Sequence, residues 1–577
     1  MRKLSLSCLL PLTFMMAAMA SARAQDAGKL TFRVFDVRDI VHAQAEALPA
    51  TAVEASFLPD AADTSDDPLV SMELADLTTL LQDCTGANYW ERDGVEIRPD
   101  EAGFLSVRCS AEQHAFVAKT LQQVRQLLFE PITIEVHELP ASALSSRRTV
   151  ITAQEADKLI AAAGPHPVHS GRTTLNNRVL IEPKELRNRV EDIRMRVATS
   201  ASMVDPVVAT DAYGSSWEVW ALRTVSGSLL VTATGTSRTL DPQVVKRKAG
   251  TGKGGEAIEL DLATTTMTTC MSSARLSAGQ AMLVGSEAPD GQVVCIRVRR
   301  HGQAAGTRIG HVEAYPIGSL VQSVRPGPNP RIPFEDARLF PEAERDSMPV
   351  VFDGDRLMEQ ITSQVDPDSW DGAPHTMHLM HSRLMVNAND DANKGVLKLL
   401  QEFDKLDARQ YTLEVRFGEV STKDAKASNP ADIASLAESL QQFCLSTVSP
   451  RRGTQLSATR HRPGVHDYSV TMAASSGAAS PHIGVTTEGF LLRGSVTPMQ
   501  DRTVMLDVDL SIFNRDKAEA VFDLKHPAVG PIDKLAVRQN KVRGQHPVEL
   551  DNWTILHLAP FAGGEKHVAV VARVHAL

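Results

Sequence analysis

Three histidines at intervals of three residues, His375, His378 and His381, are the strongest candidates for metal ligands in this sequence. Imidazole nitrogens are common zinc ligands, but a structural zinc site usually needs four ligands. On a helix the three side chains would share one sector, whereas on a strand His378 faces away from the other two. These residues align with a predicted strand and hairpin in an earlier, similar stretch of the sequence, described below. We therefore expect solvated histidines in a hairpin, and the three remain weak metal candidates. No cofactor is expected.

Cysteines offer a second kind of chemistry. No two of them have the C-x-x-C spacing of redox or zinc motifs. An oxidising compartment would instead permit disulfides, and each of two pairs falls within one predicted domain. The candidate disulfides are therefore Cys84–Cys109 and Cys270–Cys295, with Cys444 left free. Spacing alone does not determine how cysteines pair.

Other patterns that suggest catalysis fail on their details. Residues 250–255 are similar to a phosphate-binding loop, but no Ser or Thr follows Lys253 and no buried strand precedes it, so a flexible hairpin tip is the better interpretation. Asp507 and Asp509 share one face of a strand, yet their alternation with apolar residues is typical of a half-buried strand. Neither a Gly-x-Ser-x-Gly nor a His-Glu-x-x-His motif occurs. We therefore predict that the protein is not an enzyme.

The elements that would position these residues occur twice. Apolar positions between Leu105 and Val136 recur at identical offsets between Leu384 and Val415, while intervening polar residues differ. A repeated core pattern indicates a duplicated supersecondary unit. The matched positions are Leu105, Val107, Val117, Leu121, Val124, Leu127, Ile134 and Val136 in the first stretch, and Leu384, Val386, Val396, Leu400, Phe403, Leu406, Leu413 and Val415 in the second.

Each copy is predicted to be a small β-α-β-β-α module. The second copy should begin with a strand at 349–352. Trp90, expected to open a strand, and Trp370 precede the hairpin in their copies, which favours core packing over ligand stacking. A module of about 60 residues is near the lower limit for independent folding, so we expect each module to pack on a neighbour.

The expected fold class is α+β, with two such modules, each followed by a β-rich domain. Predicted strands in the β-rich regions include 219–234 and 293–298 in the first and 503–511 and 567–574 in the second. We expect two separate, closed β domains. The predicted boundaries are a signal peptide at 1–24, a first module at 25–130 with an acidic insertion at 47–67, a first β-rich domain at 131–305, a Pro-rich linker at 306–346, a second module at 347–408 and a second β-rich domain at 409–577.

Composition and charge exclude several functional classes. The chain has 577 residues, of which 43% are hydrophobic and 23% charged, as is typical of globular proteins. Acidic residues outnumber basic ones by 70 to 60, so no basic field would attract a phosphate backbone. Aromatic residues make up only 5%, too few to favour stacking of single-stranded nucleic acid. We expect no nucleic-acid partner.

The first residues have the pattern of a secretory signal. Arg2 and Lys3 form a positive region, an apolar stretch follows, and Ala22 and Ala24 provide the small residues that a signal peptidase recognises. We therefore expect cleavage before Gln25 and export. The expected location is the periplasm or the periphery of the outer membrane.

Several segments together resemble the bacterial secretins, which form rings in type II and type III secretion and type IV pilus systems. Asp36–Asp39, Trp90 and Gly94 are similar to the N-terminal periplasmic modules of that family. The strands at 132–138 and 411–420 resemble the opening strand of its β domain, and later similarities lie at 489–498, 506–510 and 548–556. Two departures stand out: only a trace of the family's pore-region motif survives at 527–537, and the chain carries two β-rich regions instead of one.

This resemblance implies a non-enzymatic, exported structural or assembly component of a secretion- or pilus-type envelope system. Its partners would be proteins, with a homo-oligomeric ring and other envelope secretion components as candidates, and association with the outer membrane left open. The alternative is a soluble periplasmic binding or scaffold protein that uses the same folds without forming a pore.

Overall fold

A computed structural model describes most of the chain beyond its first 29 residues. The expected signal peptide and acidic insertion lie outside the described residues. The described residues are 30–41, 73–143, 148–175, 178–198, 201–251, 257–286, 291–301, 308–321, 352–370, 375–380, 382–422, 425, 429–450, 452–473, 476–500, 502–515, 521–522, 530–533, 537–560 and 566–577.

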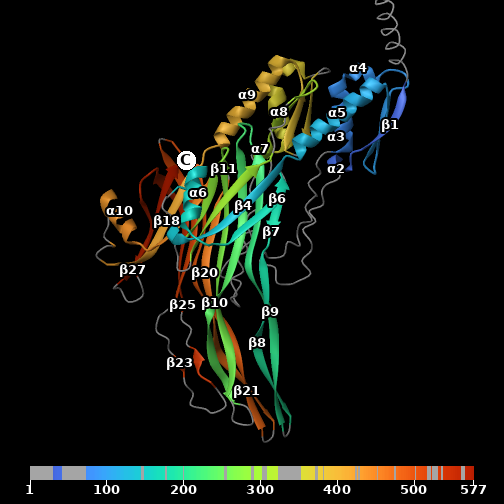
Figure 1. The fold of residues 1–577 in the computed structure, drawn as a ribbon. Helices are drawn as coiled ribbons and strands as arrows, with labels where there is room; N and C mark the ends of the chain where they lie inside the picture. The colour runs from blue at the N-terminus through green and yellow to red at the C-terminus, as the bar shows by residue number, and fades with distance from the viewer. Residues whose placement is uncertain are drawn as a thin grey trace, which may run out of the picture.

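The first module is a three-stranded antiparallel sheet, in the order β1-β3-β2, with helices on one face (Figure 1). Leu121 of α5 and Leu77 of α3 lie on apolar stripes that face the sheet. The Ser110 side chain caps α5 by accepting a hydrogen bond from the Gln113 N–H. The elements are β1 (Thr31–Asp36), α2 (Arg38–Val41), α3 (Leu74–Thr85), α4 (Ala87–Trp90), β2 (Glu96–Asp100), β3 (Phe104–Cys109) and α5 (Ala111–Leu128).

The second module is a four-stranded antiparallel sheet, in the order β14-β15-β17-β16, covered on one face by α8 and α9. Leu357, Ile361 and Leu400 of these helices are buried against Leu384 and Val386 of β17. Its elements are β14 (Arg308–Ile309), β15 (Val312–Pro316), α7 (Gly318–Val321), α8 (Gly354–Gln364), the 3-10 helix η5 (Pro367–Ser369), β16 (Thr376–Met380), β17 (Arg383–Asn387) and α9 (Asp390–Asp407).

The linker predicted at 306–346 was wrong for residues 308–321, which form β14, β15 and α7. Strand β15 is buried on both faces: Ala314 packs towards the first module, and Tyr315 packs towards α9. A strand buried on both faces lacks the apolar–polar alternation by which a strand is recognised. The nearby prolines therefore led to the prediction of a linker here. Of the strand expected at 349–352, only Phe352 is described, and it is not in a strand.

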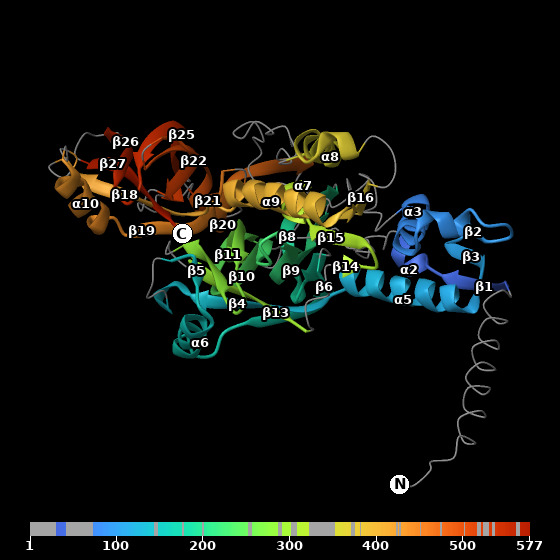
Figure 2. The ribbon, with the colours of Figure 1, turned by 90° about the horizontal axis from the view of Figure 1, so that it is seen from above.

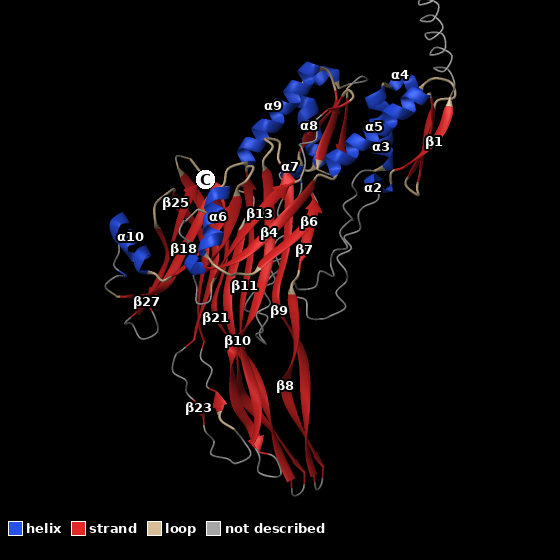
Figure 3. Cartoon of the chain, viewed as in Figure 1, coloured by secondary structure: helices blue, strands red, loops and turns tan. Residues whose placement is uncertain are grey.

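Two nine-stranded antiparallel sheets form the rest of the molecule (Figure 3). The short-strand sheet has the order β26-β27-β18-β19-β12-β13-β4-β6, with β5 paired to β12. Its strands are β4 (Pro131–Pro140), β5 (Val150–Ile151), β6 (Val168–Thr174), β12 (Ala281–Ser286), β13 (Gln292–Arg300), β18 (Tyr411–Ser421), β19 (Gln442–Val448), β26 (Thr554–Pro560) and β27 (Lys566–Ala576).

The long-strand sheet has the order β25-β22-β21-β20-β11-β10-β9-β7, with β8 paired to β9. Its hairpins extend away from the two modules (Figure 1). The strands are β7 (Arg178–Ile181), β8 (Lys184–Ala198), β9 (Ala201–Arg223), β10 (Leu229–Thr251), β11 (Ala257–Leu276), β20 (Thr454–Ala473), β21 (Ser476–Pro498), β22 (Thr503–Arg515) and β25 (Val537–Glu549), while β23 (Val521–Phe522) and β24 (Ile532–Asp533) pair separately.

One hydrophobic core joins the two large sheets. It contains Ile134 and Val415 from the short-strand sheet together with Trp217, Phe490 and Leu510 from the long-strand sheet. Because both sheets contain strands from both β-rich regions, the expectation of two separate, closed β domains was wrong. The regions join through edges that each would otherwise leave unpaired, and unpaired strand edges tend to find partners.

Two short helices cover the other face of the short-strand sheet. Helix α6 (Ala153–Ala162) buries Leu159 against Leu283, and α10 (Pro430–Ser439) buries Leu436 against Val571. Thr152 and Glu155 form the complete capping box of α6, as their spacing predicts. None of the helices in the described ranges is long and apolar enough to cross a membrane.

Two local predictions were wrong. Trp90 ends helix α4 instead of opening a strand, because its indole N–H donates to Thr85 and turns the ring onto the module core. The range 219–234 is a hairpin and not one strand. Its turn contains Gly227 at φ 87°, a left-handed conformation that glycine adopts readily.

Candidate assembly surfaces

The two β-rich regions meet along one strand pair in each large sheet. In the long-strand sheet, β11 pairs with β20 from Thr265 opposite His461 to Met271 opposite Gln455. In the short-strand sheet, β12 pairs with β19 at Gly285 opposite Leu445. Buried hydroxyl groups lie at this junction: the Ser446 hydroxyl hydrogen-bonds to those of Ser272 and Thr454.

A buried ion network connects this junction to the second module. Arg275 of β11 donates to Asp404 at 2.7 Å and to Asp407 at 2.8 Å, both at the end of α9. Arg452, which precedes β20, donates to Asp407 at 3.3 Å and to the Ser319 carbonyl at 2.8 Å. The four charged side chains are at most 8% exposed. Removing one partner of such a group leaves a buried charge uncompensated, so the network specifies how α9 sits on the sheets.

The helices of the first module cover the outer face of the second module's sheet. Asp83 of α3 accepts hydrogen bonds from Thr376 at 2.6 Å and is 3.3 Å from His378 Nε2. Arg383 of β17 donates to the Leu127 carbonyl of α5 at 2.7 Å. Val312, Ala314 and Met385 of the second module therefore belong to the hydrophobic core of the first module.

A second group of charges, two of them buried (Glu130 and Arg383) and two half-buried (Arg223 and Arg300), lies near this contact. Glu130 accepts a hydrogen bond from Arg300 at 2.5 Å, and Arg223 lies 3.8 Å away. Burial, with the repulsion of Arg223, lowers the pKa of Arg383 to about 10, although Glu130 acts in the opposite direction. Arg383 still carries its charge at neutral pH. The group thus anchors the first module to the β sheets and to the second module.

Glu138 is the buried carboxylate that most resembles a catalytic acid or base. Burial acts to raise its pKa, but hydrogen bonds from His169, Ser215 and Trp217 outweigh that effect and hold the pKa below its usual value. Its Oε1 accepts from the Trp217 indole at 2.8 Å, and its Oε2 accepts from Ser237 at 3.3 Å. Because Glu138 lies on β4 and Trp217 on β9, the carboxylate links the two large sheets.

At one side of the molecule, no described residue covers the outer face of the first module's sheet or the edge strands of the two large sheets. On β1, Phe32 is 63% exposed and Val34 is 54% exposed, and both lie on the face opposite α3 and α5. Exposed apolar side chains also occur on the neighbouring edges, at Val168 of β6 and Leu186 of β8. We call this the N-side surface. A hollow of about 550 Å³ on it is lined by Phe32, Glu96, Arg98, Pro99, Asp100, Glu101 and Ser106.

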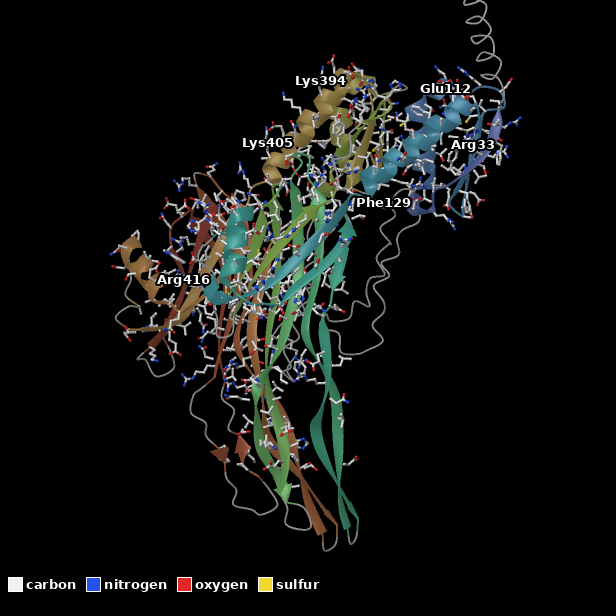
Figure 4. All side chains as sticks on the ribbon, in the orientation of Figure 1. Arg33, Glu112, Phe129, Lys394, Lys405 and Arg416 are labelled. Atoms are coloured by element: carbon white, nitrogen blue, oxygen red, sulfur yellow. The ribbon has the colours of Figure 1, made fainter. Side chains whose placement is uncertain are left out.

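Strands β25 and β26 lie on the far side of the molecule from the first module, with α8 and α9 between them (Figure 2). Strands β25 and β26 are the outermost strands of the two large sheets there. Helix α9 presents Leu406, which is 62% exposed, and Lys394 and Lys405 of the same helix project into solvent (Figure 4). We call α8, α9, β25 and β26 together the C-side surface.

Two of the three histidines considered as metal ligands, His375 and His378, have other partners in the structure. His375 accepts a hydrogen bond from the Asn389 N–H at 3.2 Å, and His378 contacts Asp83 at the module contact. His381 lies outside the described residues. Within the described part of the chain, no group of three His, Cys, Asp or Glu side chains could hold a metal ion.

The structure contains neither predicted disulfide. All five described cysteines are free and buried. Cys84 donates to the Ile309 carbonyl at 3.3 Å, within the module contact. Cys270 faces the core between the two large sheets, whereas Cys295 faces α6 on the other side of the short-strand sheet. The short-strand sheet therefore lies between the two thiols, which cannot be bridged without moving the backbone.

The remaining sequence patterns have structural roles. Strands β10 and β11 pair as far as Thr251 opposite Ala257, and the glycine-rich residues 252–256 lie outside the described residues. Asp507 is exposed on β22 between the buried Leu506 and Val508, as expected of a half-buried strand. Trp370 donates its indole N–H to the Val365 carbonyl and packs on the second module's core.

Sequence reasoning missed the buried charges, above all Asp404 and Asp407. Both lie in the last turn of α9, where acidic residues oppose the helix dipole. That unfavourable position, in a helix with an otherwise regular apolar stripe, was the signal that these carboxylates have buried partners elsewhere.

Comparison with known proteins gives a structural likeness only. No family model matches the chain, and no curated protein matches it. Among solved structures it is similar to the secretin domain of InvG from the Salmonella SPI-1 injectisome, with 10% identity, a TM-score of 0.23 and coverage of 46% of this chain and 87% of that one. It is also similar to ExeD of Aeromonas hydrophila (10% identity, TM-score 0.19, 95% and 90% covered) and to the type II secretin GspD of E. coli K12 (8%, 0.19, 95% and 90%). The chain thus resembles secretin β domains at a low TM-score.

Proposed function

We propose that this chain is a non-enzymatic, exported structural component of a secretion- or pilus-type envelope system, built as a tandem duplication of a secretin-like unit. Each unit comprises one module and one β-rich region, so one chain supplies two adjacent positions of an assembly. The observation that carries the proposal is the strand order of the two large sheets.

That order reads the same way twice. In the short-strand sheet, β6-β4-β13-β12 of the first half is followed by β19-β18-β27-β26 of the second half. In the long-strand sheet, β7 and β8, then β9-β10-β11, are followed by β20-β21-β22-β25. The order is what a duplication would produce if its two copies packed side by side. It extends the repeat of apolar positions found in the sequence.

Details of the modules support the same interpretation. Trp90 donates to Thr85 and Trp370 donates to Val365, so each indole N–H bonds five residues upstream at the same place in its module. In each module, two helices cover one face of an antiparallel sheet. The buried ions lie in contacts between elements and pair with one another, which supports a structural role over catalysis.

Cell fractionation tests the proposed function. The full-length chain, produced in a Gram-negative host, is expected to sediment with the outer membrane and to require detergent, not salt, for release. Negative-stain images of that material should show assemblies. Release by salt as a small soluble species would contradict the proposal and favour the periplasmic scaffold.

A further inference from the structure

We propose that the N-side surface of one chain binds the C-side surface of a second copy, reproducing the contact that joins the two halves within a chain. This inference rests on the tandem duplication proposed above and names the partner and the contacting residues. The occupant of both uncovered surfaces is therefore the same protein, joined head to tail.

The modules provide the first argument. Val34 pairs with Ser106, between Leu105 and Val107, and Ala314 pairs with Met385, between the matching Leu384 and Val386. By the same register, Phe32 takes the place of Val312. Yet Val312 and Ala314 are 1% and 0% exposed beneath α3 and α5, whereas Phe32 and Val34 are 63% and 54% exposed. The first module thus lacks the cover that it gives to the second.

The missing cover is present at the other end of the chain. Leu127 of α5 is 3% exposed in the module contact, and its carbonyl accepts the hydrogen bond of Arg383. The matching residue of α9 is Leu406, which is 62% exposed. Helices α8 and α9 of one copy would cover Phe32 and Val34 of the next, and burial of these three side chains is favourable.

The two large sheets give an independent argument. In the long-strand sheet, β25 is the last strand of the second half, just as β11 is the last strand of the first half. Strands β7 and β8 are the first strands of the first half, and β20 is the first strand of the second half. Joining β25 to β8, and β26 to β6, would continue both sheets across the boundary between chains. Val168 and Leu186, exposed on the edges of β6 and β8, would then lie within an interface.

The hydrogen-bond registers give residue pairs. Leu229 pairs with Leu276 in the first half, and the corresponding residues Val504 and Val548 pair in the second half. Thr265 precedes Leu276 by as many residues as Val537 precedes Val548, so Val537 corresponds to Thr265. Leu186 likewise takes the place of His461, the partner of Thr265. Leu186 of one chain should therefore pair with Val537 of the next.

The modules give a second pair. Arg98 pairs with Ser106 as His378 pairs with Met385, so Arg98 takes the place of His378. Ser363 lies two residues before Val365, as Asp83 lies two residues before Thr85. The contact between Asp83 and His378 thus predicts that Ser363 of one chain meets Arg98 of its neighbour. Both residues are exposed in the single chain.

Such a contact is heterologous, because it joins two different surfaces. Heterologous contacts form a closed ring when the rotation between neighbours closes and a filament when it does not. The contact between the two halves of one chain would be the same as the contact between neighbouring chains. Each chain would therefore fill two equivalent positions of a closed ring, one with each module. The number of positions would always be even.

Cysteine cross-linking tests this arrangement. The paired variants Leu186→Cys with Val537→Cys, and Arg98→Cys with Ser363→Cys, are expected to give ladders of covalent oligomers on mild oxidation of the full chain. The matched controls recombine the same four cysteines as Leu186→Cys with Ser363→Cys and Arg98→Cys with Val537→Cys. These controls should give no ladder, and the native cysteines are buried.

A second variant addresses assembly without cross-linking. Leu406→Asp changes a side chain that is exposed in the single chain, so the thermal midpoint of the unassembled chain should stay unchanged while the mass in solution, measured by light scattering, falls to that of a single chain. Absence of ladders from both designed pairs, ladders from the recombined pairs, or unchanged assembly in Leu406→Asp would overturn the inference. If the designed pairs give ladders but salt alone releases the chain from membranes, the proposed envelope function is overturned and the head-to-tail contact stands.

Discussion

At the scale of single residues, the charged groups that sequence patterns passed over determine how the parts of the molecule are joined. Asp407 accepts hydrogen bonds from Arg275 and Arg452 while only 2% exposed. Such a carboxylate contributes by compensating two buried cations. Polar residues that did attract attention in the sequence, such as His375 and Asp507, lie in hairpins and strands instead.

We predict that Asp407→Ala lowers the free energy of unfolding by about 3–5 kcal/mol, because it removes the carboxylate that two buried guanidinium groups share and leaves their charge only partly compensated. Asp391→Ala is the control, since its ion pair with Lys394 is exposed to solvent and should contribute little to stability. Urea denaturation followed by tryptophan fluorescence measures both. Equal small effects would show that the network does not stabilise the fold.

His461 gives a prediction about pH. It is buried on β20 with both ring nitrogens 3.1 Å from threonine hydroxyls, those of Thr459 and Thr487. Burial, together with the charge of Arg238, lowers the pKa of His461 to about 4. The unfolded chain binds this proton near pH 6.5 and the folded chain does not. Stability is therefore retained above about pH 6.5 and falls as pH decreases towards 4, by on the order of 3 kcal/mol.

His461→Asn should flatten that part of the pH dependence, whereas His482→Asn, at an exposed position on β21, should leave it unchanged. The measurement is the urea midpoint of each variant between pH 7.5 and pH 4.5. An identical slope in wild type and His461→Asn would contradict the assignment, whatever the absolute stability of the variant.

At the scale of elements, helix α9 shows how one helix can serve two purposes. Its apolar stripe, with Val396 and Leu400 fully buried, faces its own sheet. A second apolar position, Leu406, faces outward. The i, i+3 and i+4 spacing accounts for the first stripe, and only the pattern of contacts between modules gives the second a role.

We predict that Leu400→Ala lowers the free energy of unfolding by about 2–5 kcal/mol, because it removes a fully buried side chain and leaves a cavity. Leu406→Ala, on the same helix but exposed, should change it by no more than about 0.5 kcal/mol. Both are measured by chemical denaturation of the unassembled chain. Similar effects at the two positions would contradict the assignment of the two faces.

At the scale of the whole molecule, the shared core makes the two halves interdependent. Residues of both halves, such as Trp217 and Phe490, belong to one hydrophobic cluster. Separating the halves would expose the edges of β11 and β12 in one fragment and of β19 and β20 in the other. Unpaired edges of this length favour self-association.

We therefore predict that fragments 25–301 and 308–577, produced separately, do not persist as monomers, and that the two co-purify in equal amounts when produced together. Tagging one fragment and measuring recovery of the other tests this, with size-exclusion chromatography of each alone. Two stable, monomeric fragments that ignore each other would contradict a shared core.

The sequence alone determined the local structure. Helix α5 with its cap, the capping box of α6, and the matched positions Leu121 and Leu400 follow from spacing and side-chain type, because these depend on residues a few positions apart. The tertiary structure alone decided that the two β-rich regions share their sheets, that Cys270 and Cys295 lie on opposite sides of one sheet, and that Asp407 is buried. Strand edges and buried charges take their partners from other elements that are distant in the sequence, and a local pattern contains no record of which distant partner packs best.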